Sequence, residues 1–526
     1  MSAYRGRLLA AGTLLLSPYV AMSFWLASHR GLQGCAAYLL VCLCGLLLLA
    51  IPAVTIRRFL WWHFPVFLAC TLISGYAVVG DQLPGYPIAL VLQTSPWEEV
   101  RGFFGLWQGE RLLLLFAAGA LGYLMLALSI PATLRLPGGS RVIGRVAVGC
   151  LGLLAVDAAA SPETLMEGAA ASPVLGAAMF VTGPWSSVDY EIHGAVMRKH
   201  PYGAQRVGVK EVHILVIGES SRRDSWSVYG YARPTTPYLR SIEGEVIFLR
   251  NAVTDANATI YAVPILLTGS RPEAFQAWAT TGNLVDLTKE SGYFTAWLVN
   301  QDPTSSNLVG VAADASEYTY QPERMTYFAS YSPDQVLLSE FERQLARKDV
   351  PLFVGLHVYG SHAPYSNRYP SSFAHFSVAG EQRDSLDSYD DTIRYTDWFL
   401  GQVIERVRKL DVPATVTYLS DHGEDLQQLD GRSGHGASDY SPHAFQIPAF
   451  VWSNLAYRRK HPEKIAAVVA NASKEVRTHD FFYSLADLMG IRWPGLSSKS
   501  SFASADFVPD VTEKHIAGGR LVAAPH

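Results

Sequence analysis

Cysteine is scarce in this chain, and its positions limit how the chain can be stabilised. The five cysteines are Cys35, Cys42, Cys44, Cys70 and Cys150, and all lie within or beside apolar runs. Residues 151–526 contain none, so no disulfide can form within them. A fold in this part of the chain has to rely on a large hydrophobic core, which about 300 residues can supply.

An excess of charge of either sign is also absent. The chain has 42 lysine and arginine residues against 46 aspartate and glutamate residues, which gives a formal net charge of −4 and a pI near 6.4. A protein that binds nucleic acid presents a strongly basic surface, so this balance argues against a nucleic-acid partner. Internal repeats and low-complexity tracts are also lacking in the sequence.

Long apolar runs, by contrast, are abundant before residue 160. They occur at 8–27, 35–55, 59–79, 112–130 and 143–160. Most approach the roughly 20 residues that a helix needs to cross a bilayer, although the fifth contains Arg145 and Asp157. A cleaved signal peptide would account only for the first run, so we interpret that run as an anchor and predict five transmembrane helices.

Basic residues at the ends of these runs predict their orientation. They are Arg5, Arg7, Arg57, Arg58, Arg135, Arg141 and Arg145. The positive-inside rule makes these ends cytoplasmic, which leaves the 80–111 loop and everything after about residue 160 on the outer side. In that loop, residues 86–99 mix apolar, aromatic and acidic side chains, as an interfacial helix does. We therefore predict a transmembrane domain at 1–160, a linker at 161–210 and an exported domain at 211–526.

The exported domain alternates strand-like and helical patterns. Short, nearly continuous apolar runs occur at 212–217, 246–249, 293–299, 352–356, 414–419 and 447–452. Buried strands that are covered on both faces have this character. Apolar residues recur at helical spacing from Leu386 to Val407, which predicts a long amphipathic helix. The alternation predicts an α/β sandwich with a largely parallel sheet.

A carboxylate and an imidazole follow one of these strands, in the segment Leu419–Glu424. Adjacent side chains of a regular strand point to opposite faces, so Asp421 and His422 converge only if the strand ends there and turns, as Gly423 permits. Ligands of open α/β sheets gather at this carboxyl edge, which favours a divalent metal site. A turn with a simple Asp–His hydrogen bond is the alternative.

A second carboxylate, Glu219, directly follows the strand predicted at 212–217. If this strand neighbours the one that ends before Asp421, both carboxylates share a site with the imidazole of His422. Such a set of oxygen and nitrogen ligands suits Zn²⁺ or Mn²⁺. A glutamate that merely caps a following helix is the alternative.

Thr259 opens an apolar segment with a predicted helix. A hydroxyl at a helix N-terminus faces unpaired backbone N–H groups, which can hold a phosphate while the hydroxyl attacks it. A nearby metal would lower the pKa of that hydroxyl. A threonine at such a position more commonly just caps its helix.

Three histidines, His357, His362 and His435, lie on segments that follow predicted strands. Each of them alone would more often be a structural histidine than a ligand. Their shared place after strands of one sheet suggests phosphate binding or a second metal.

These motifs together resemble those of bacterial phosphoethanolamine transferases, which belong to the alkaline phosphatase and sulfatase superfamily. The resemblance runs from about Val212 to Pro494 and extends more loosely over the five-span region. The motifs that carry it are Gly218–Asp224, Tyr229–Pro237, Thr259 with Pro264, Tyr389–Asp391 with Tyr395–Asp397, and Ser420–Glu424.

The resemblance implies roles for individual residues. Glu219, Thr259, Asp421 and His422 would surround a catalytic zinc, with Thr259 as the nucleophile. His362, His435 and His357 would hold the transferred phosphate or a second zinc, and Thr94 and Glu98 would lie near the lipid headgroup. The implied enzyme sits in a bacterial inner membrane with its catalytic domain in the periplasm. It would transfer phosphoethanolamine from phosphatidylethanolamine to an envelope glycan or lipopolysaccharide through a phospho-threonine intermediate.

The sequence departs from the family pattern in three places, and the first of these bears on the expected acceptor. The exported domain lacks the disulfide-forming cysteines of the lipid A-modifying members, which favours a branch that acts on lipopolysaccharide core sugars or periplasmic glucans. Gln446 stands where many members have a histidine, and Leu90 replaces a polar residue one helical turn before Thr94.

Three other functions compete with this interpretation. A phosphoglycerol transferase would use the same nucleophile with phosphatidylglycerol as donor, often with Mn²⁺. A sulfatase is disfavoured because no Cys/Ser-x-Pro-x-Arg motif stands at the nucleophile position. A non-catalytic envelope protein of the same fold is disfavoured by the intact set of ligand residues.

Overall fold

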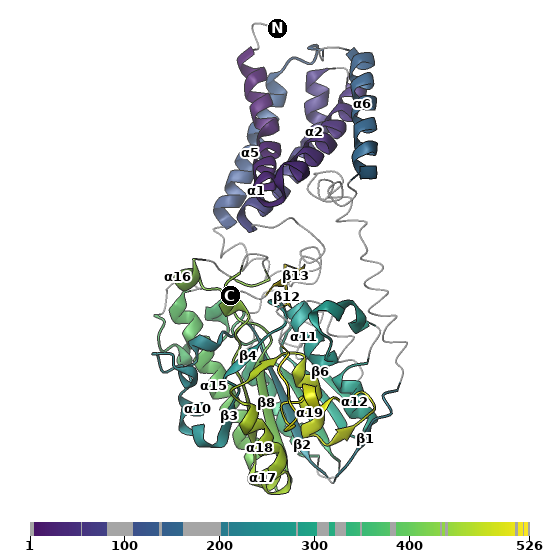
Figure 1. Ribbon diagram of the computed structural model, residues 1–526. Coiled ribbons are helices and arrows are strands. Elements are labelled where there is room, and N and C mark those ends of the chain that lie inside the picture. The colour runs from purple at the N-terminus through teal and green to yellow at the C-terminus, as the bar shows by residue number, and fades with distance from the viewer. Residues whose placement is uncertain are drawn as a thin grey trace. The chain divides into compact units, whose positions relative to one another are not determined.

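The computed structural model shown in Figure 1 describes residues 5–53, 55–80, 109–135, 139–160, 201–208, 210–279, 282–301, 315–320, 333–347, 350–378, 385–431, 434–436, 440–510, 514–518 and 520–523. The chain divides into two compact units, one with the helices before residue 161 and one with the sheet after residue 200. Most of the predicted interfacial loop, and the predicted linker up to residue 200, lie outside the described residues. The domain boundaries at 160 and 210 therefore stay predictions.

The first unit is built from helices. They are α1 (Arg5–Ala53), α2 (Ile56–Gly80), α5 (Gly109–Ser129) and α6 (Gly139–Ala160). Within the described residues, the stretch Gly6–Phe24 is long and apolar enough to cross a membrane, whereas Cys35–Ile51 and Phe116–Ser129 are shorter apolar stretches. Five crossings therefore stay a prediction.

Helix α1 contains the first two predicted spans, and its contacts with α2 show that it is not straight. The Ser74 hydroxyl lies 2.8 Å from the Pro18 carbonyl oxygen. The Cys70 sulfur, one helical turn from Ser74, lies 3.8 Å from the Tyr38 hydroxyl. In a straight helix Pro18 and Tyr38 would be about 30 Å apart. Helix α1 therefore bends between Pro18 and Tyr38.

The second unit is organised around a seven-stranded sheet with the order β3-β9-β8-β2-β7-β5-β6. Its strands are β2 (Val212–Gly218), β3 (Val246–Phe248), β5 (Phe294–Val299), β6 (Glu317–Tyr320), β7 (Leu352–His357), β8 (Ala414–Ser420) and β9 (Ala449–Ser453). All neighbours from β8 to β6 pair in parallel, and β9 alone runs antiparallel to both of its neighbours. The sheet is therefore mixed but largely parallel, and six of its strands match the predicted runs.

Helices cover both faces of this sheet, which confirms the α/β sandwich. One face carries α11 (Thr259–Thr268), α12 (Leu284–Glu290) and α19 (Asp480–Leu488), and the other carries α14 (Leu337–Leu345) and the predicted long helix α15 (Leu386–Arg408).

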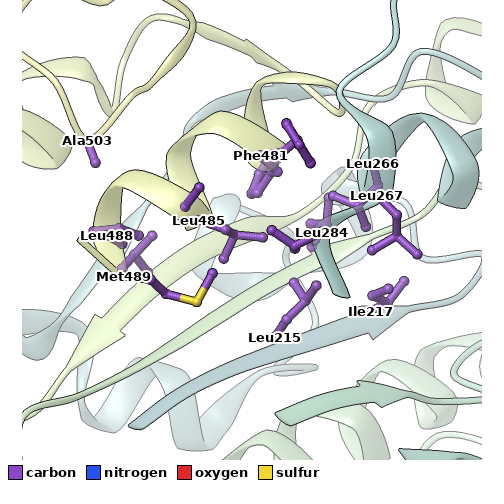
Figure 2. Packing of buried hydrophobic residues seen from close by; sticks show 14 of the residues in the cluster. Leu215, Ile217, Leu266, Leu267, Leu284, Phe481, Leu485, Leu488, Met489 and Ala503 are labelled. Carbon is purple, nitrogen blue, oxygen red and sulfur yellow. The ribbon is translucent and has the colours of Figure 1, made fainter. Parts of the chain in front are cut away.

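Alternate side chains of β2 feed the cores on these two faces. Leu215 and Ile217 pack with Leu266 and Leu485 on one face, as Figure 2 shows, and Val216 packs on the other. Each fully buried side chain of this kind contributes about 1.5–3 kcal/mol to stability.

Smaller elements complete the second unit. The short helices are α10 (Pro237–Ser241), α16 (Gln427–Asp430), α17 (Leu455–Lys460) and α18 (Pro462–Asn471). Three strand pairs lie apart from the main sheet: β1 (Gln205–Arg206) with β11 (Ile491–Arg492), β4 (Asn251–Val253) with β10 (Glu475–Arg477), and β12 (Lys514–Ala517) with β13 (Arg520–Ala523). Strand β1 falls in the predicted linker and pairs with β11, so the last residues of that segment belong to the second unit.

Candidate active site

Glu219 and Asp421 meet because their strands are neighbours in register. In the parallel pair of β2 and β8, Gly218 lies opposite Ser420, so the next residue of each strand is one of the two carboxylates. The N–H of Ser220 donates to Asp421 Oδ1 at 3.2 Å across the two strand ends. Glu219 is 1% exposed and Asp421 is fully buried.

The chain leaves β8 through a turn at Gly423, as predicted, and the structure supplies the reason for glycine there. A Cβ on Gly423 would lie 2.0 Å from the carbonyl oxygen of His443. The N–H of Gly423 donates to the carbonyl of Ala444 at 2.8 Å. Gly423 is thus required by the close approach of two backbone segments.

The Thr259 hydroxyl lies among the acidic and imidazole groups. Its Oγ1 is 3.1 Å from Glu219 Oε2 and 3.2 Å from His422 Nε2. The Nδ1 atom of His422 is 2.8 Å from the carbonyl oxygen of Gly423, which keeps a proton on Nδ1. Its Nε2 atom also lies 3.3 Å from Glu219 and 3.4 Å from Asp421. The structure thus brings together Glu219, Thr259, Asp421 and His422, the four residues predicted to surround a metal. We call these four residues the metal set.

Burial and mutual charge govern how these groups ionise. Burial raises the pKa of Asp421, and the charge of Glu219 raises it further, to about 7. Burial also disfavours the charged form of Glu219, but the hydrogen bond and charge of His422 outweigh this and hold its pKa well below the usual range. Burial lowers the pKa of His422, whereas the charges of both carboxylates and a hydrogen bond raise it to about 10.

The arrangement suits a divalent cation. Ligand atoms of Glu219, Asp421 and His422 all lie within 4.8 Å of one another. Within the described part of the chain, Asp421 Oδ2 is buried and accepts no hydrogen bond. This oxygen lies 3.4 Å from His422 Nε2, and a buried carboxylate oxygen that accepts no hydrogen bond is costly unless a cation offsets its charge. Two carboxylates, one imidazole and the hydroxyl of Thr259 form an oxygen and nitrogen set that fits Zn²⁺ or Mn²⁺.

Two of the three predicted histidines adjoin this set. His435 Nδ1 lies 2.7 Å from Glu424 Oε2, and the His435 ring centroid is 4.2 Å from that of His422. The ring of His362 is 5.4 Å from that of His435. Two further groups of ligand atoms within 4.8 Å result, one of Glu219, His362 and His435 and one of His422, Glu424 and His435.

His357 is the last residue of β7, opposite Ile217 of the neighbouring β2. It belongs to none of the three groups of ligand atoms found among the described residues. Burial lowers its pKa to about 4, so the buried ring is neutral near pH 7.

The structure adds three residues that the sequence reasoning did not single out. Ser220 Oγ donates to Glu219 Oε1 at 2.8 Å, and Gln301 Nε2 donates to Glu219 Oε2 at the same distance. Glu424 contacts His435 as described above. Ser220 and Glu424 lie inside the motifs that carry the family resemblance, and Gln301 lies two residues after the buried strand β5, where polar residues favour a site.

The remaining sequence-predicted positions fall outside the site or outside the described residues. Thr94 and Glu98 lie outside the described residues. Gln446 accepts hydrogen bonds from Arg223 and is not one of the residues of the metal set. Its Oε1 accepts from the guanidinium at 3.1 Å, and its backbone carbonyl accepts from the N–H of Arg223 at 3.0 Å.

A sequence profile of the sulfatase family matches residues 212–491, which include all four residues of the metal set. Among curated relatives, the putative transferase YhbX of Escherichia coli (strain K12) is 30% identical over 246 residues, which cover 46% of this chain and 43% of YhbX. Phosphoethanolamine transferase EptC of the same strain is 24% identical over 310 residues, which cover 56% of this chain and 53% of EptC. The chain thus spans about half the length of these curated relatives.

Solved structures show the same fold. The integral membrane protein lipooligosaccharide phosphoethanolamine transferase A from Neisseria meningitidis matches with a TM-score of 0.68 and 20% identity, over 94% of this chain and 98% of that chain. The periplasmic domain of EptC from Escherichia coli, solved as a complex with Zn, matches with a TM-score of 0.56 and 23% identity, over 62% of this chain and 96% of that chain.

Proposed function

The chain belongs to the sulfatase family, and from this premise we propose that it transfers phosphoethanolamine from phosphatidylethanolamine to an envelope glycan or lipopolysaccharide. The observation that carries the proposal is the place of Thr259, whose hydroxyl opens α11 3.1 Å from Glu219 and 3.2 Å from His422. EptC of Escherichia coli, a curated relative, is named a phosphoethanolamine transferase, which supports this choice of transferred group.

In this proposal Glu219, Thr259, Asp421 and His422 hold one divalent cation, Zn²⁺ or alternatively Mn²⁺. When bound, the cation would lower the pKa of the Thr259 hydroxyl and offset the negative charge of the two buried carboxylates. Asp421 Oδ2, which is buried and accepts no hydrogen bond among the described residues, supports a cation at this place. The Zn complex of the EptC periplasmic domain, which shares this fold, also supports a metal.

The proposed reaction has two steps. Thr259 Oγ1 forms a bond to the phosphorus of the donor, the bond to diacylglycerol breaks, and diacylglycerol takes up the proton that Thr259 gives up. An acceptor hydroxyl then attacks the phosphorus, its proton passes to Thr259, and phosphoethanolamine leaves on the acceptor. The backbone N–H groups at the start of α11 would stabilise the charge on the phosphoryl oxygens in both steps.

Further residues receive proposed roles around this reaction. His362 and His435 lie beside the metal set and would hold the transferred phosphate or a second cation. Thr94 and Glu98 would contact the lipid headgroup. Anchoring in a bacterial inner membrane, with the catalytic domain in the periplasm, gives the enzyme direct access to a lipid donor.

Trapping the intermediate tests the proposal. Full-length protein incubated with phosphatidylethanolamine without an acceptor should accumulate phosphoethanolamine on Thr259, because the second step lacks its substrate. Peptide mass spectrometry would locate and weigh the adduct. Thr259→Ala should form none, and Thr259→Ser serves as the matched control that retains a hydroxyl.

The outcome also decides between donors. A phosphoglycerol adduct formed from phosphatidylglycerol would keep the mechanism but replace the donor. An adduct on another residue, or normal turnover by Thr259→Ala, would refute the mechanism itself.

A further inference from the structure

The loop 254–258, which leads into Thr259 at the start of α11, pairs with the hairpin of β12 and β13. We call it the Thr259 loop. The N–H of Ile516 in β12 donates to the carbonyl of Asp255 at 2.8 Å, and the N–H of Asn257 donates back to the carbonyl of Ile516 at 3.1 Å. Between these bonds, Ala256 is fully buried and packs in one apolar cluster with Ile516. Strand β12 thus acts as the strand partner of a loop that belongs to no strand of the main sheet.

Arg477 joins this loop to the hairpin. Its Nε donates to Asp255 Oδ1 at 2.8 Å, and its guanidinium also donates to the carbonyl of Lys514 at the start of β12. Arg477 is 1% exposed. The other carboxylate oxygen of Asp255 lies 2.9 Å from both the N–H and Nδ1 of His479. One buried carboxylate therefore connects the loop, the hairpin and the start of α19.

The same loop touches the metal set on its inner side. Thr254 Oγ1 donates to the carbonyl of Asp421 at 2.6 Å. The carbonyl of Thr254 lies 2.9 Å from His515 Nδ1 in β12. The loop is thus fixed between the hairpin and the backbone of a metal-set residue, only a few residues before Thr259.

The contacts of Asp255 with Arg477 and His479 are strengthened by charge. Burial disfavours the charged form of Asp255, but the charges of His479 and Arg477 outweigh it and hold its pKa below the usual range. Burial lowers the pKa of His479, but the charge and hydrogen bond of Asp255 and further carboxylates outweigh this and raise it to about 10. Asp255 and His479 are therefore both charged near pH 7, and a buried charge that loses its partner strongly destabilises its position.

We infer that the β12–β13 hairpin and Arg477 are a positioning device for Thr259, which sets its hydroxyl against Glu219 and His422. This inference rests on the proposed function in taking Thr259 as the nucleophile. Reacting groups must be held to within about 1 Å, and a shift of that size can cost roughly 100-fold in rate. The hairpin lies beyond residue 491, where the match to the family profile ends.

A matched pair of proline substitutions in the full-length, zinc-loaded protein tests the inference. Ile516→Pro removes the N–H that binds Asp255. Leu521, which pairs with Ile516, has its own N–H directed away from β12, because Ile516 uses both of its backbone groups on the loop. Leu521 is 45% exposed, and Leu521→Pro is therefore the control for proline in this hairpin.

Two readouts separate positioning from general stability. Ile516→Pro should raise amide hydrogen exchange at residues 254–258 by about 10-fold or more, and should lower kcat by at least roughly 10-fold with KM for the donor unchanged. Leu521→Pro should change neither readout by more than about 2-fold. Arg477→Lys, which keeps the charge but loses the forked geometry, should shift both in the same direction as Ile516→Pro.

The outcomes bear on the inference and on the proposed function separately. Wild-type exchange at 254–258 together with wild-type kcat in Ile516→Pro would overturn the inference. So would equal losses in Leu521→Pro. If Ile516→Pro does not fold, Arg477→Lys decides by the same two readouts. A wild-type protein that transfers no phosphoethanolamine would refute the proposed function, whereas the exchange measurement would still decide whether the hairpin holds the loop.

Discussion

Gln301 Nε2 donates a 2.8 Å hydrogen bond to Oε2 of Glu219, the same oxygen that the Thr259 hydroxyl contacts. The amide nitrogen of Gln301 also lies 3.0 Å from the carbonyl oxygen of Val358, so it is fixed from two sides. A group that orients a ligand carboxylate in this way tunes the metal that the carboxylate binds.

Replacing Gln301 should therefore weaken metal binding without removing a ligand. For Gln301→Met, which keeps the side-chain length but has no donor, we expect zinc affinity to fall by about 10- to 100-fold in a chelator competition. Asn300→Met is the matched control, because Asn300 Nδ2 binds Asp334 rather than Glu219. An equal loss of affinity in both variants would show that orientation of Glu219 is not the cause.

Asp421→Asn should abolish metal binding while leaving the fold intact. The substitution keeps the shape of the side chain and removes a charge whose Oδ2 atom accepts no hydrogen bond among the described residues. We expect little bound zinc by elemental analysis and a cooperative unfolding transition in metal-free protein. Full zinc occupancy in this variant would contradict the assignment of Asp421 as a ligand.

Gly423→Ala should destabilise the turn that presents His422. The added Cβ would lie 2.0 Å from the carbonyl oxygen of His443, and backbone has little room to yield. We expect a loss of about 1–3 kcal/mol in the free energy of unfolding. Gly244→Ala is the control, since a Cβ there has no atom within 4 Å. Equal stability of both variants in thermal unfolding would argue against the crowding.

The free energy of unfolding of the second unit should depend on pH through Glu211. Burial disfavours its charge, but hydrogen bonds from His213, His461 and Lys460 outweigh this and lower its pKa from 4.5 to about 2. Because the folded pKa lies below the unfolded one, the stabilisation is complete above about pH 4.5 and is lost as the pH falls toward 2.

Glu211→Gln should accordingly lower the free energy of unfolding by about 2 kcal/mol near neutral pH. The difference from wild type should shrink between about pH 4.5 and pH 3, as followed by chemical unfolding of the full-length protein. A difference that stays constant down to about pH 3 would contradict the role of the Glu211 charge.

The predicted topology can be tested with reporter fusions. Because Arg135 and Arg141 flank it, a fusion after Pro137 should report a cytoplasmic position, and a fusion after Arg206 should report a periplasmic one. The reverse pattern would overturn both the orientation and the access to a periplasmic lipid surface.

The sequence predicted most of the sheet because buried parallel strands leave continuous aliphatic runs, such as 212–217 and 414–419. Strand β6 (Glu317–Tyr320) escaped prediction because its alternating polar residues carry no such run. Glu219, Asp421 and His422 could be predicted from the sequence because each lies within two residues of the end of a recognisable strand.

Gln301 also lies two residues after a predicted strand, but its contact with Glu219 could not be predicted from the sequence, and Ile516 has no such positional signal. The bond from Gln301 to Glu219 depends on β5 and β2 both flanking β7, a strand order that the chain order does not reveal. Ile516 acts through its backbone, on a loop far away in sequence, so its side chain carries no signal of the role.

If the hairpin positions Thr259 as inferred, it also determines when the proposed site is completed during synthesis. Ribosomes add about 5–20 residues per second, so Ile516 follows Asp421 by roughly 5–20 s. Throughout that interval the nascent chain already contains Glu219, Thr259, Asp421 and His422 but lacks the strand that pairs with the Thr259 loop. Under the inferred positioning role, a nascent chain that still lacks Ile516 should transfer phosphoethanolamine at least roughly 10-fold more slowly than one that contains the hairpin.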